Sequence, residues 1–365
     1  MQLIEGVVQN YAWGSHEALA QIQGRPAPTE KPEAELWFGA HPGAPGVLLD
    51  LIEADPEGQL GQGRTRLPFL LKLLAAERAL SIQVHPTKAQ AEAGFAADEA
   101  AGIALDAFER NYKDDNHKPE LLVALGEFEA MAGFRPLART AELLEWLAVP
   151  ELDFLHAAVV DGDLREAVEH TLHLPAQDLP RIIDALTRRC RDVAGQDQGW
   201  MGDVADLVVR LEEQYPADVG VLFGLLLNRV VLQEGEALYL DAGQLHAYVR
   251  GTGVEIMANS DNVLRCGLTP KHIDVAELLS VVRWEELADP RLRADNAGVY
   301  HTPAEEFSLC RIDGTGQVTG PAIVLAVGDT AECGELQVES GSAAWVPAGE
   351  EATVRGKAFI ARPGA

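Results

Sequence analysis

Cysteine is scarce in this chain. Four cysteines occur among 365 residues, widely spaced and with no Cys-x-x-Cys pair, at Cys190, Cys266, Cys310 and Cys333. This spacing argues against a disulfide framework and against a zinc site built from cysteines. Such sparing use of cysteine is typical of a reducing compartment, so we expect a cytoplasmic protein.

Basic residues are also few. The chain has 29 lysines and arginines against 57 acidic residues, which gives a net charge of −28. Such a surface repels nucleic acid and anionic lipid at long range, and we expect neither as a partner. A phosphorylated small molecule would be repelled as well. Any anion site must therefore be a local pocket of basic side chains, which makes the few clustered bases informative.

Long hydrophobic runs are missing too. The longest, VGVLFGLLL from Val219, is far too short to cross a bilayer. The first fifteen residues lack the basic stretch and apolar core of a secretory signal. Hydrophobic residues make up 47% and charged residues 24%, which is ordinary for a globular protein, and the length predicts two or three packed units.

The first part of the chain predicts strands and loops. Residues 1–86 combine short apolar runs with glycine and proline clusters. The apolar run at 67–76 fits either a strand or a helix, because its periodicity does not decide. The next segment is rich in alanine and acidic residues, and it predicts a helix capped by Thr87 and broken near Gly94 and Gly102.

The middle of the chain predicts helices, and β texture returns after it. Several runs there place apolar residues at helical spacing, as at Val204, Leu207, Val208 and Leu211. The later strands are short and cut by turns, which is typical of a double-sheet jelly roll or a similar barrel. We therefore predict a β domain at 1–136 together with 225–285 that carries a helical excursion at 87–111, a helical insertion at 137–224, and a C-terminal β domain at 286–365.

Two β segments share a rhythm of strand, turn and strand. LQEGEALYLDAGQLHAY begins at Leu232, and LQVESGSAAWVPAGEEATV begins at Leu336. The similarity predicts two related β-barrels. The second segment has no histidine at the place of His246, so we expect a metal site in the first barrel alone.

Four polar residues form a candidate metal site. Gln83 and His85 lie two residues apart on a predicted strand and share one face with Ser81. Glu120 begins another predicted strand, and His246 comes directly after a turn. If the two imidazoles, the carboxylate and the amide converge, they form a nitrogen and oxygen site suited to Zn²⁺, Fe²⁺ or Mn²⁺. The alternative is an edge strand with one wet face, hydrogen-bonded turn histidines and a surface acid.

Several motifs together resemble the type I mannose-6-phosphate isomerases, also called phosphomannose isomerases. They occur in the family's order and span most of the first 280 residues. The matching segments are YAWGS at Tyr11, AELWFGAHP at Ala34, LPFLLKLL at Leu67, LSIQVHP at Leu80, YKDDNHKPEL at Tyr112, MAGFRP at Met131, LDAGQLHAYVRGTGVEIMANSDNVLRCGLTPKH at Leu240 and VAELL at Val275.

The resemblance implies a fold, a metal and a reaction. The fold is a double cupin, two jelly-roll β-barrels with an inserted helical domain. The metal is one Zn²⁺ per chain, held by Gln83, His85, Glu120 and His246. The reaction is the interconversion of mannose 6-phosphate and fructose 6-phosphate through a cis-enediol, and a monomer would suit the family.

We assign roles to six further residues, from this resemblance and from their places beside the predicted metal site. They are Arg265, Glu255 and Lys118 as catalytic residues and Ser81, Lys271 and Tyr248 as substrate-binding residues. Arg265 would stabilise the enediolate with the zinc, and Ser81 and Lys271 would bind the phosphate. Glu255 is the preferred acid/base, with Lys118 and a metal-bound water as alternatives. Lys271 is otherwise interpreted as a charge at a helix N-terminus.

Two positions depart from the family pattern. Asp241 stands where proline is usual, which affects the stiffness of a turn. Cys266 stands where alanine is frequent, and we interpret it as packing. Two other functions stay open, a non-catalytic sugar-phosphate-binding cupin and an iron-dependent cupin dioxygenase.

Overall fold

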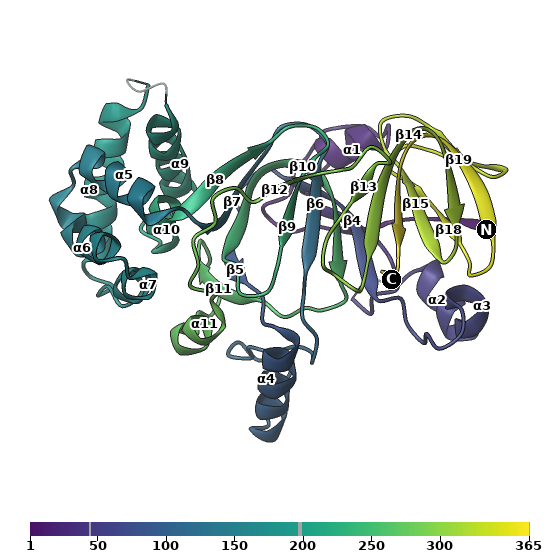
Figure 1. The fold of residues 1–365 in the computed structure, drawn as a ribbon, viewed down its shortest axis with the longest axis horizontal. Coiled ribbons are helices and arrows are strands. Elements are labelled where there is room, and N and C mark those ends of the chain that lie inside the picture. Colours follow the sequence, from purple (N-terminus) through teal and green to yellow (C-terminus); the bar gives the residue numbers. More distant parts are fainter. Residues whose placement is uncertain (44, 196–198, 365) are drawn as a thin grey trace.

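The computed structural model describes residues 1–43, 45–195 and 199–364. It is a mixed α/β structure with two β-sheets and a helical region formed by the middle of the chain (Figure 1). The helical region lies at one end of an elongated molecule, the larger sheet in the middle, and the smaller sheet at the other end, close to both termini. The predicted domain boundaries and the closure of the sheets into barrels stay predictions.

The larger sheet has 11 strands around the long strand β10. β10 pairs antiparallel with four strands, β4, β5, β6 and β7. The strands are β2 (Val7–Gln9), β3 (Glu35–Phe38), β4 (Phe69–Ala76), β5 (Ile82–Val84), β6 (Glu120–Ala124), β7 (Phe128–Phe134), β8 (Leu227–Leu232), β9 (Glu236–Leu240), β10 (His246–Ala258), β11 (Leu264–Gly267) and β12 (Arg291–Arg293).

The smaller sheet has eight strands and packs against the larger one. A shared core joins side chains such as Leu71 and Ile256 of the larger sheet to Trp345 and Phe359 of the smaller. The strands are β1 (Gln2–Ile4), β13 (Val299–Tyr300), β14 (Ser308–Thr319), β15 (Ala322–Ala326), β16 (Ala331–Cys333), β17 (Leu336–Val338), β18 (Ala343–Val346) and β19 (Glu351–Arg362).

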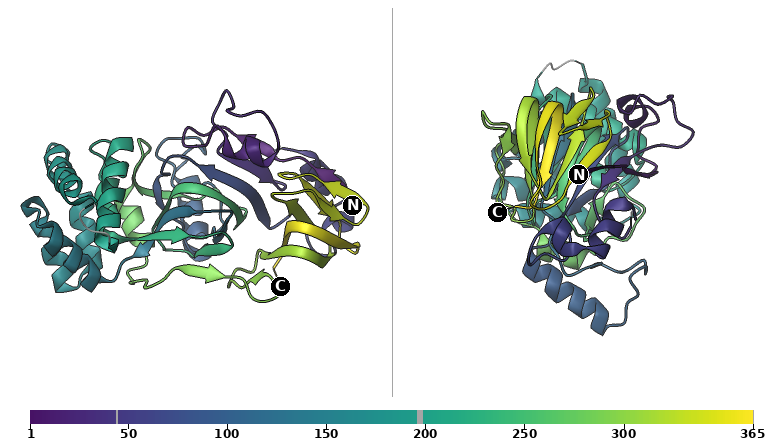
Figure 2. Two further views of the ribbon diagram at one scale, coloured as in Figure 1. Left: turned by 90° about the horizontal axis from the view of Figure 1, so that it is seen from above. Right: turned by 90° about the vertical axis from the view of Figure 1, so that its right-hand side faces the viewer.

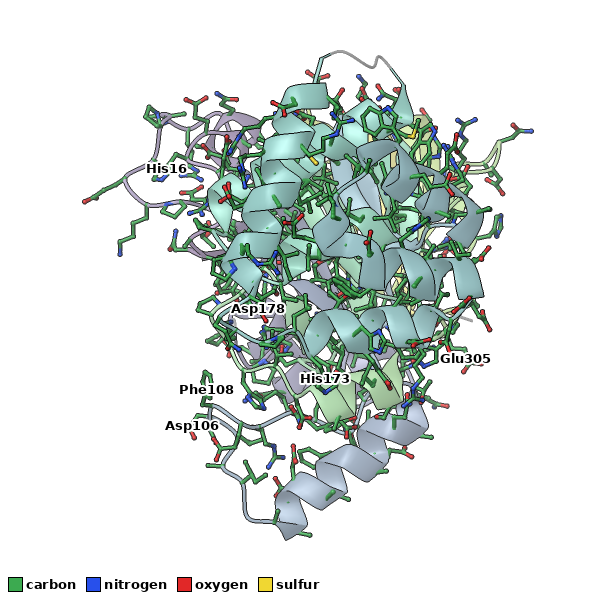
Figure 3. The ribbon with its side chains drawn as sticks, turned by 90° about the vertical axis from the view of Figure 1, so that its left-hand side faces the viewer. His16, Asp106, Phe108, His173, Asp178 and Glu305 are labelled. Atoms are coloured by element: carbon green, nitrogen blue, oxygen red, sulfur yellow. The ribbon has the colours of Figure 1, made fainter. Side chains whose placement is uncertain are left out.

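The helical region covers the far end of the larger sheet (Figure 3). The four residues at 204–211 that were predicted to share one helix face are all buried in the core of this region. The elements are α5 (Leu137–Leu147), the 3₁₀ helix Pro150–Leu152, α6 (Asp153–Asp161), α7 (Leu164–Leu172), α8 (Leu179–Val193), α9 (Trp200–Gln214) and α10 (Gly220–Leu226). None of the helices in the described ranges is both long and apolar enough to span a bilayer.

The remaining helices correct the predictions for the first part of the chain. Strands and loops were expected at 1–86, but α1 (Ala18–Ile22), α2 (Val47–Ala54) and α3 (Pro56–Leu60) also form there. They are short, and two of the three have only five residues, too few to show a period. The ambiguous run at 67–76 becomes β4, which is buried along its whole length.

The predicted break at Gly94 is wrong. α4 (Lys88–Ala100) runs through it without interruption and projects from the body of the molecule (Figure 2). The expected cap is confirmed, because the Thr87 side chain accepts from Gln90 and the two residues form a capping box. The lack of a side chain at Gly94 lets the ring of Tyr112 pack against the helix, since a Cβ there would lie 2.2 Å from that ring.

Candidate active site

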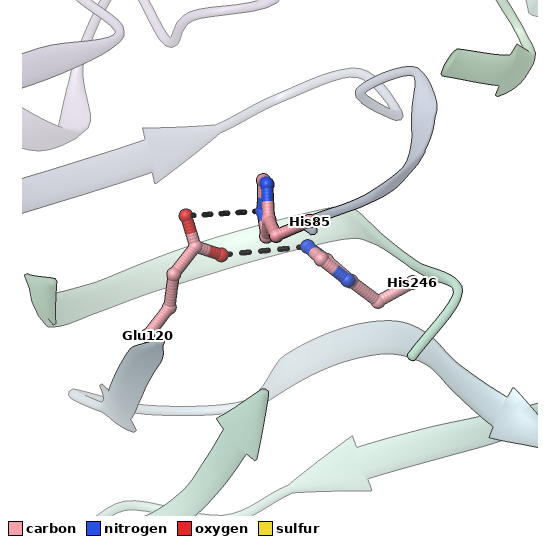
Figure 4. A group of neighbouring side chains, drawn as sticks. All are labelled: His85, Glu120 and His246. Atoms are coloured by element: carbon pink, nitrogen blue, oxygen red, sulfur yellow. Dashed lines mark ion pairs between the residues drawn. The ribbon is translucent and has the colours of Figure 1, made fainter. Parts of the chain in front are cut away.

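Three of the predicted metal ligands converge in the larger sheet. His85 comes directly after β5, Glu120 begins β6 and His246 begins β10. The Glu120 oxygens lie 3.5 Å from His85 Nε2 and 3.4 Å from His246 Nε2 (Figure 4). All three side chains are buried, and one ligand atom from each lies within 4.8 Å of the others.

The hydrogen bonds of His85 and His246 leave the Nε2 lone pair of each ring directed toward Glu120. His85 Nδ1 lies 2.7 Å from the Asn262 carbonyl, and His246 Nδ1 lies 2.9 Å from the Gln244 carbonyl. Because a carbonyl only accepts, each Nδ1 carries the proton and each Nε2 lone pair faces Glu120. Buried His85 Nε2 and Glu120 Oε2 have no hydrogen-bond partner among the described residues. Buried acceptors without donors are what a cation site requires.

The protonation states also fit a metal. Burial lowers the pKa of His85 to about 4 against the opposing charge of Glu120, so its imidazole is neutral at pH 7. Burial alone would raise the pKa of Glu120, but Lys118 and His85 lower it well below its ordinary value. The Lys118 ammonium lies 2.9 Å from Glu120 Oε1. The site therefore offers the neutral imidazole of His85 and the carboxylate of Glu120.

Gln83 lies at the same centre. It is the cross-strand partner of His246, and its amide nitrogen lies 3.2 Å from His246 Nε2. Arg265 of β11 pairs with Gln83 on its other side. Three neighbouring strands thus bring an amide, an imidazole and a guanidinium to one place.

A cavity of about 620 Å³ opens beside this cluster. Its size is within the range of small-molecule sites. Five of the predicted site residues line it: Ser81, Gln83, Lys118, Arg265 and Lys271. Glu255 and Tyr248 are not among the described residues that line it. They lie behind its wall, where Tyr248 donates to Glu255 at 2.7 Å and Glu255 pairs with Lys72 at 2.9 Å.

Sequence reasoning missed Lys72 and Glu35, which both line the cavity. Lys72 is buried in β4 and lies 3.3 Å from Glu35 and 2.9 Å from Glu255. Burial alone would lower the pKa of Lys72, but the carboxylates of Glu255 and Glu35 raise it above its ordinary value. A lysine in the middle of an apolar run was the signal that could have found it.

The structure places Lys271 before a helix rather than on one. α11 (Val275–Val281) begins four residues later and is capped by Asp274, so Lys271 belongs to a loop that lines the cavity. Burial lowers the pKa of Lys271, and nearby Arg265 and Lys113 lower it further. Mutual repulsion among these bases marks a local positive region in an acidic protein.

Comparison with known proteins gives a consistent result. Residues 1–137 match the model of the phosphomannose isomerase type I catalytic domain. The chain is 38% identical to the mannose-6-phosphate isomerase of Escherichia coli K12, over 99% of both chains. It belongs to the type I phosphomannose isomerase family.

Solved structures of this family share the fold of the whole chain. One is a mannose 6-phosphate isomerase from Salmonella typhimurium bound to fructose 6-phosphate and zinc, with a TM-score of 0.90, 35% identity and complete coverage of both chains. Another, a single-residue variant of the Salmonella typhimurium phosphomannose isomerase, gives a TM-score of 0.91 at 34% identity, again over both complete chains. The predicted family membership is confirmed.

Proposed function

We propose that this protein is a zinc-dependent isomerase that interconverts mannose 6-phosphate and fructose 6-phosphate. The observation that carries the proposal is the buried cluster of His85, Glu120 and His246, with unpartnered ligand atoms beside a base-lined cavity. The family relationship and the sugar phosphate bound by the Salmonella relative support the substrate.

Gln83, His85, Glu120 and His246 would hold one Zn²⁺ per chain. The donor set of nitrogens and oxygens suits zinc, and rotation of the Gln83 amide would turn its oxygen toward the metal. When bound, zinc supplies a Lewis acid that polarises the substrate carbonyl and makes the neighbouring C–H more acidic.

The basic wall of the cavity binds the phosphate. Ser81 and Lys271 line it together with Arg265. Since the chain carries a net charge of −28, this group of bases is what allows a dianion to approach. Arg265 also lies beside Gln83, which suits it to stabilise negative charge on the enediolate.

The proton moves between C2 and C1. A base removes the C2 proton while the carbonyl oxygen at C1 gains a proton, which gives the cis-enediol. The same base then protonates C1 as the C2 hydroxyl loses its proton, which gives the ketose. Lys118 is the better placed of the two side-chain candidates, since it lines the cavity. Glu255 is buried behind Lys72 and acts through that lysine.

The fold and setting are proposals of the same kind. The two packed sheets and the helical region support a double cupin divided at the predicted boundaries. The four cysteines are all free and buried, which supports a cytoplasmic location. We expect a monomer.

The test is turnover of mannose 6-phosphate by the purified protein, before and after chelation and after zinc is added back. Activity that is lost and then restored by zinc supports both the reaction and the metal. Absence of turnover with zinc bound would contradict the proposal. Sugar-phosphate binding without turnover would then indicate a binding protein, and oxygen uptake with iron would indicate a dioxygenase.

A further inference from the structure

The helical region touches the cavity wall at one tightly packed place. Residues 214–220, from the last residue of α9 to the first residue of α10, lie against the end of β11 and the loop after it. A Cβ on Gly267 would lie 2.5 Å from the Cα of Gly220, and a Cβ on Gly220 would lie 2.5 Å from the amide nitrogen of Leu268. Two glycines therefore allow the backbones to meet directly.

A single carboxylate fastens this contact. Asp218 Oδ1 accepts from the backbone N–H of Leu268 at 2.7 Å and of Gly220 at 2.7 Å. Its Oδ2 accepts from the N–H of Thr269 at 3.2 Å. Asp218 forms no ion pair within the described ranges, so its charge is directed at backbone N–H groups. Hydrogen bonds to an ionised acceptor are the strong ones.

The loop that begins at Leu268 requires stabilisation of this kind. Leu268 has φ +55, a left-handed conformation that is unfavourable for a residue other than glycine. Thr269 connects this loop to Lys271, because its hydroxyl accepts a hydrogen bond from the Lys271 backbone N–H at 3.1 Å. Leu268, Thr269 and Lys271 all line the cavity.

The same segment also contacts the chain just before β5, the strand that pairs with β11. Tyr215 lines the cavity, and its hydroxyl donates to the Ala79 carbonyl at 2.6 Å. The Gln214 side chain accepts from the Ala79 N–H at 2.8 Å. Ala79 is two residues before Ser81, so both proposed phosphate-binding residues lie close to points where residues 214–220 hold the backbone.

We infer that Asp218 is a positioning residue of the phosphate site, through which the helical region sets the place of Lys271. The inference rests on the proposed function, because it assumes that the loop carrying Lys271 binds the phosphate. Asp218 does not touch the substrate; it holds the backbone that presents the lysine.

The test is Asp218→Asn in the full-length, zinc-loaded protein. The amide keeps one oxygen but turns an NH₂ group toward backbone donors, so the loop loses acceptors. We expect the inhibition constant of inorganic phosphate and the KM for fructose 6-phosphate to rise about 10-fold, as for the loss of one hydrogen bond to a charged group. We expect kcat to change by less than about 3-fold and the zinc content to stay the same.

The matched control is Glu213→Gln, which removes a charge from an exposed side chain in the last turn of α9, whose partner is Arg191 at 3.8 Å. It should leave all four quantities unchanged. A merely structural role of Asp218 would lower Tm and the active fraction without raising the phosphate inhibition constant, and that result would overturn the inference.

Lys271→Met separates this inference from the proposed function. If it leaves phosphate inhibition unchanged, the proposed phosphate site is wrong. If it weakens inhibition while Asp218→Asn does not, the inference alone is overturned. If Asp218 acts through Lys271, the double variant should bind phosphate no more weakly than Lys271→Met, whereas fully additive losses would contradict that route.

Discussion

The two sheets contain a similar turn before a long strand. They differ in the residue that stands near the start of that strand. Asp241–Gln244 leads into β10 and Pro347–Glu350 leads into β19, and their central glycines have nearly equal angles, φ +79 at Gly243 and φ +78 at Gly349. Three residues after each glycine stands His246 in one sheet and Ala352 in the other. The same backbone therefore serves a candidate metal centre and a plain core.

The surroundings of these two positions explain the difference. His246 lies across from Gln83 and beside His85 and Glu120. Ala352 lies across from Val318 in a core of aliphatic side chains and two buried cysteines, with no imidazole or carboxylate. β10 and β19 are both long strands that pair with several others. The chemistry thus depends on the side chains that neighbouring strands bring, and the shared strand–turn–strand geometry supplies none of it.

The largest expected effect comes from making the first position like the second. His246→Ala should remove one zinc ligand and reduce turnover by roughly 10³-fold or more, because a metal's stabilisation of charge is worth several kcal/mol and each ~1.4 kcal/mol is tenfold. Zinc content and mannose 6-phosphate turnover measure it. A variant that keeps both its zinc and its activity would remove His246 from the metal site.

The second effect concerns how the larger sheet holds the helical region. Glu129 of β7 is buried, and it pairs with Arg210 of α9 at 2.8 Å and with Arg229 of β8 at 2.7 Å. Glu129→Gln disrupts three charged hydrogen bonds and leaves Arg210 and Arg229 with only their exposed partners, Asp206 and Asp203. We therefore expect a loss of about 3 kcal/mol in the free energy of unfolding at pH 7. Urea unfolding measures this loss.

The pH dependence sharpens this prediction. Burial alone would raise the pKa of Glu129, but Arg210 and Arg229 lower it below the ordinary value of 4.5. Such a carboxylate stabilises the fold above its unfolded pKa, and the stabilisation is lost as the pH falls through the folded pKa. The difference between Glu129→Gln and the parent should therefore shrink below pH 4.5. Glu127→Gln, which removes an exposed pair with Arg250, should cost almost nothing at either pH; an equal loss there would contradict the role of burial.

Sequence reasoning singled out residues whose signal is local. Gln83 and His85 share a strand face at a spacing of two, and the motifs around Glu120 and His246 are specific to one family. Lys72 was missed because its neighbours in β4 are apolar, and a pattern does not reveal that Glu35 and Glu255 lie opposite it. Asp218 was missed because it acts on a loop 50 residues away. The expected break at Gly94 failed for the same reason, since the ring that fills its place comes from Tyr112.

The third prediction is the reverse of His246→Ala and places a histidine in the smaller sheet. Ala352→His should recruit no second zinc, because its cross-strand partner is Val318 and the surrounding core holds no imidazole or carboxylate, only the thiols of Cys310 and Cys333, whose pKa burial raises. The larger side chain should cost about 2 kcal/mol in stability through overpacking. Metal analysis after incubation with excess zinc, together with urea unfolding, measures both. Two zinc ions per chain would show that the turn and strand are sufficient for a metal site.

The smallest effect is expected at the first residue of the turn, which is Asp241 in the larger sheet and Pro347 in the smaller one. Asp241→Pro would remove a half-exposed ion pair with Arg283, worth about 0–1 kcal/mol, and would stiffen the turn by a similar amount. The lost N–H makes only a long contact, 3.5 Å, with the Gln244 side chain. The free energy of unfolding should therefore change by less than about 1 kcal/mol, and zinc content should not change. A loss of zinc would mean that Asp241 keeps the Gln244 carbonyl in place for His246, and that the two turns, alike in backbone, are not interchangeable.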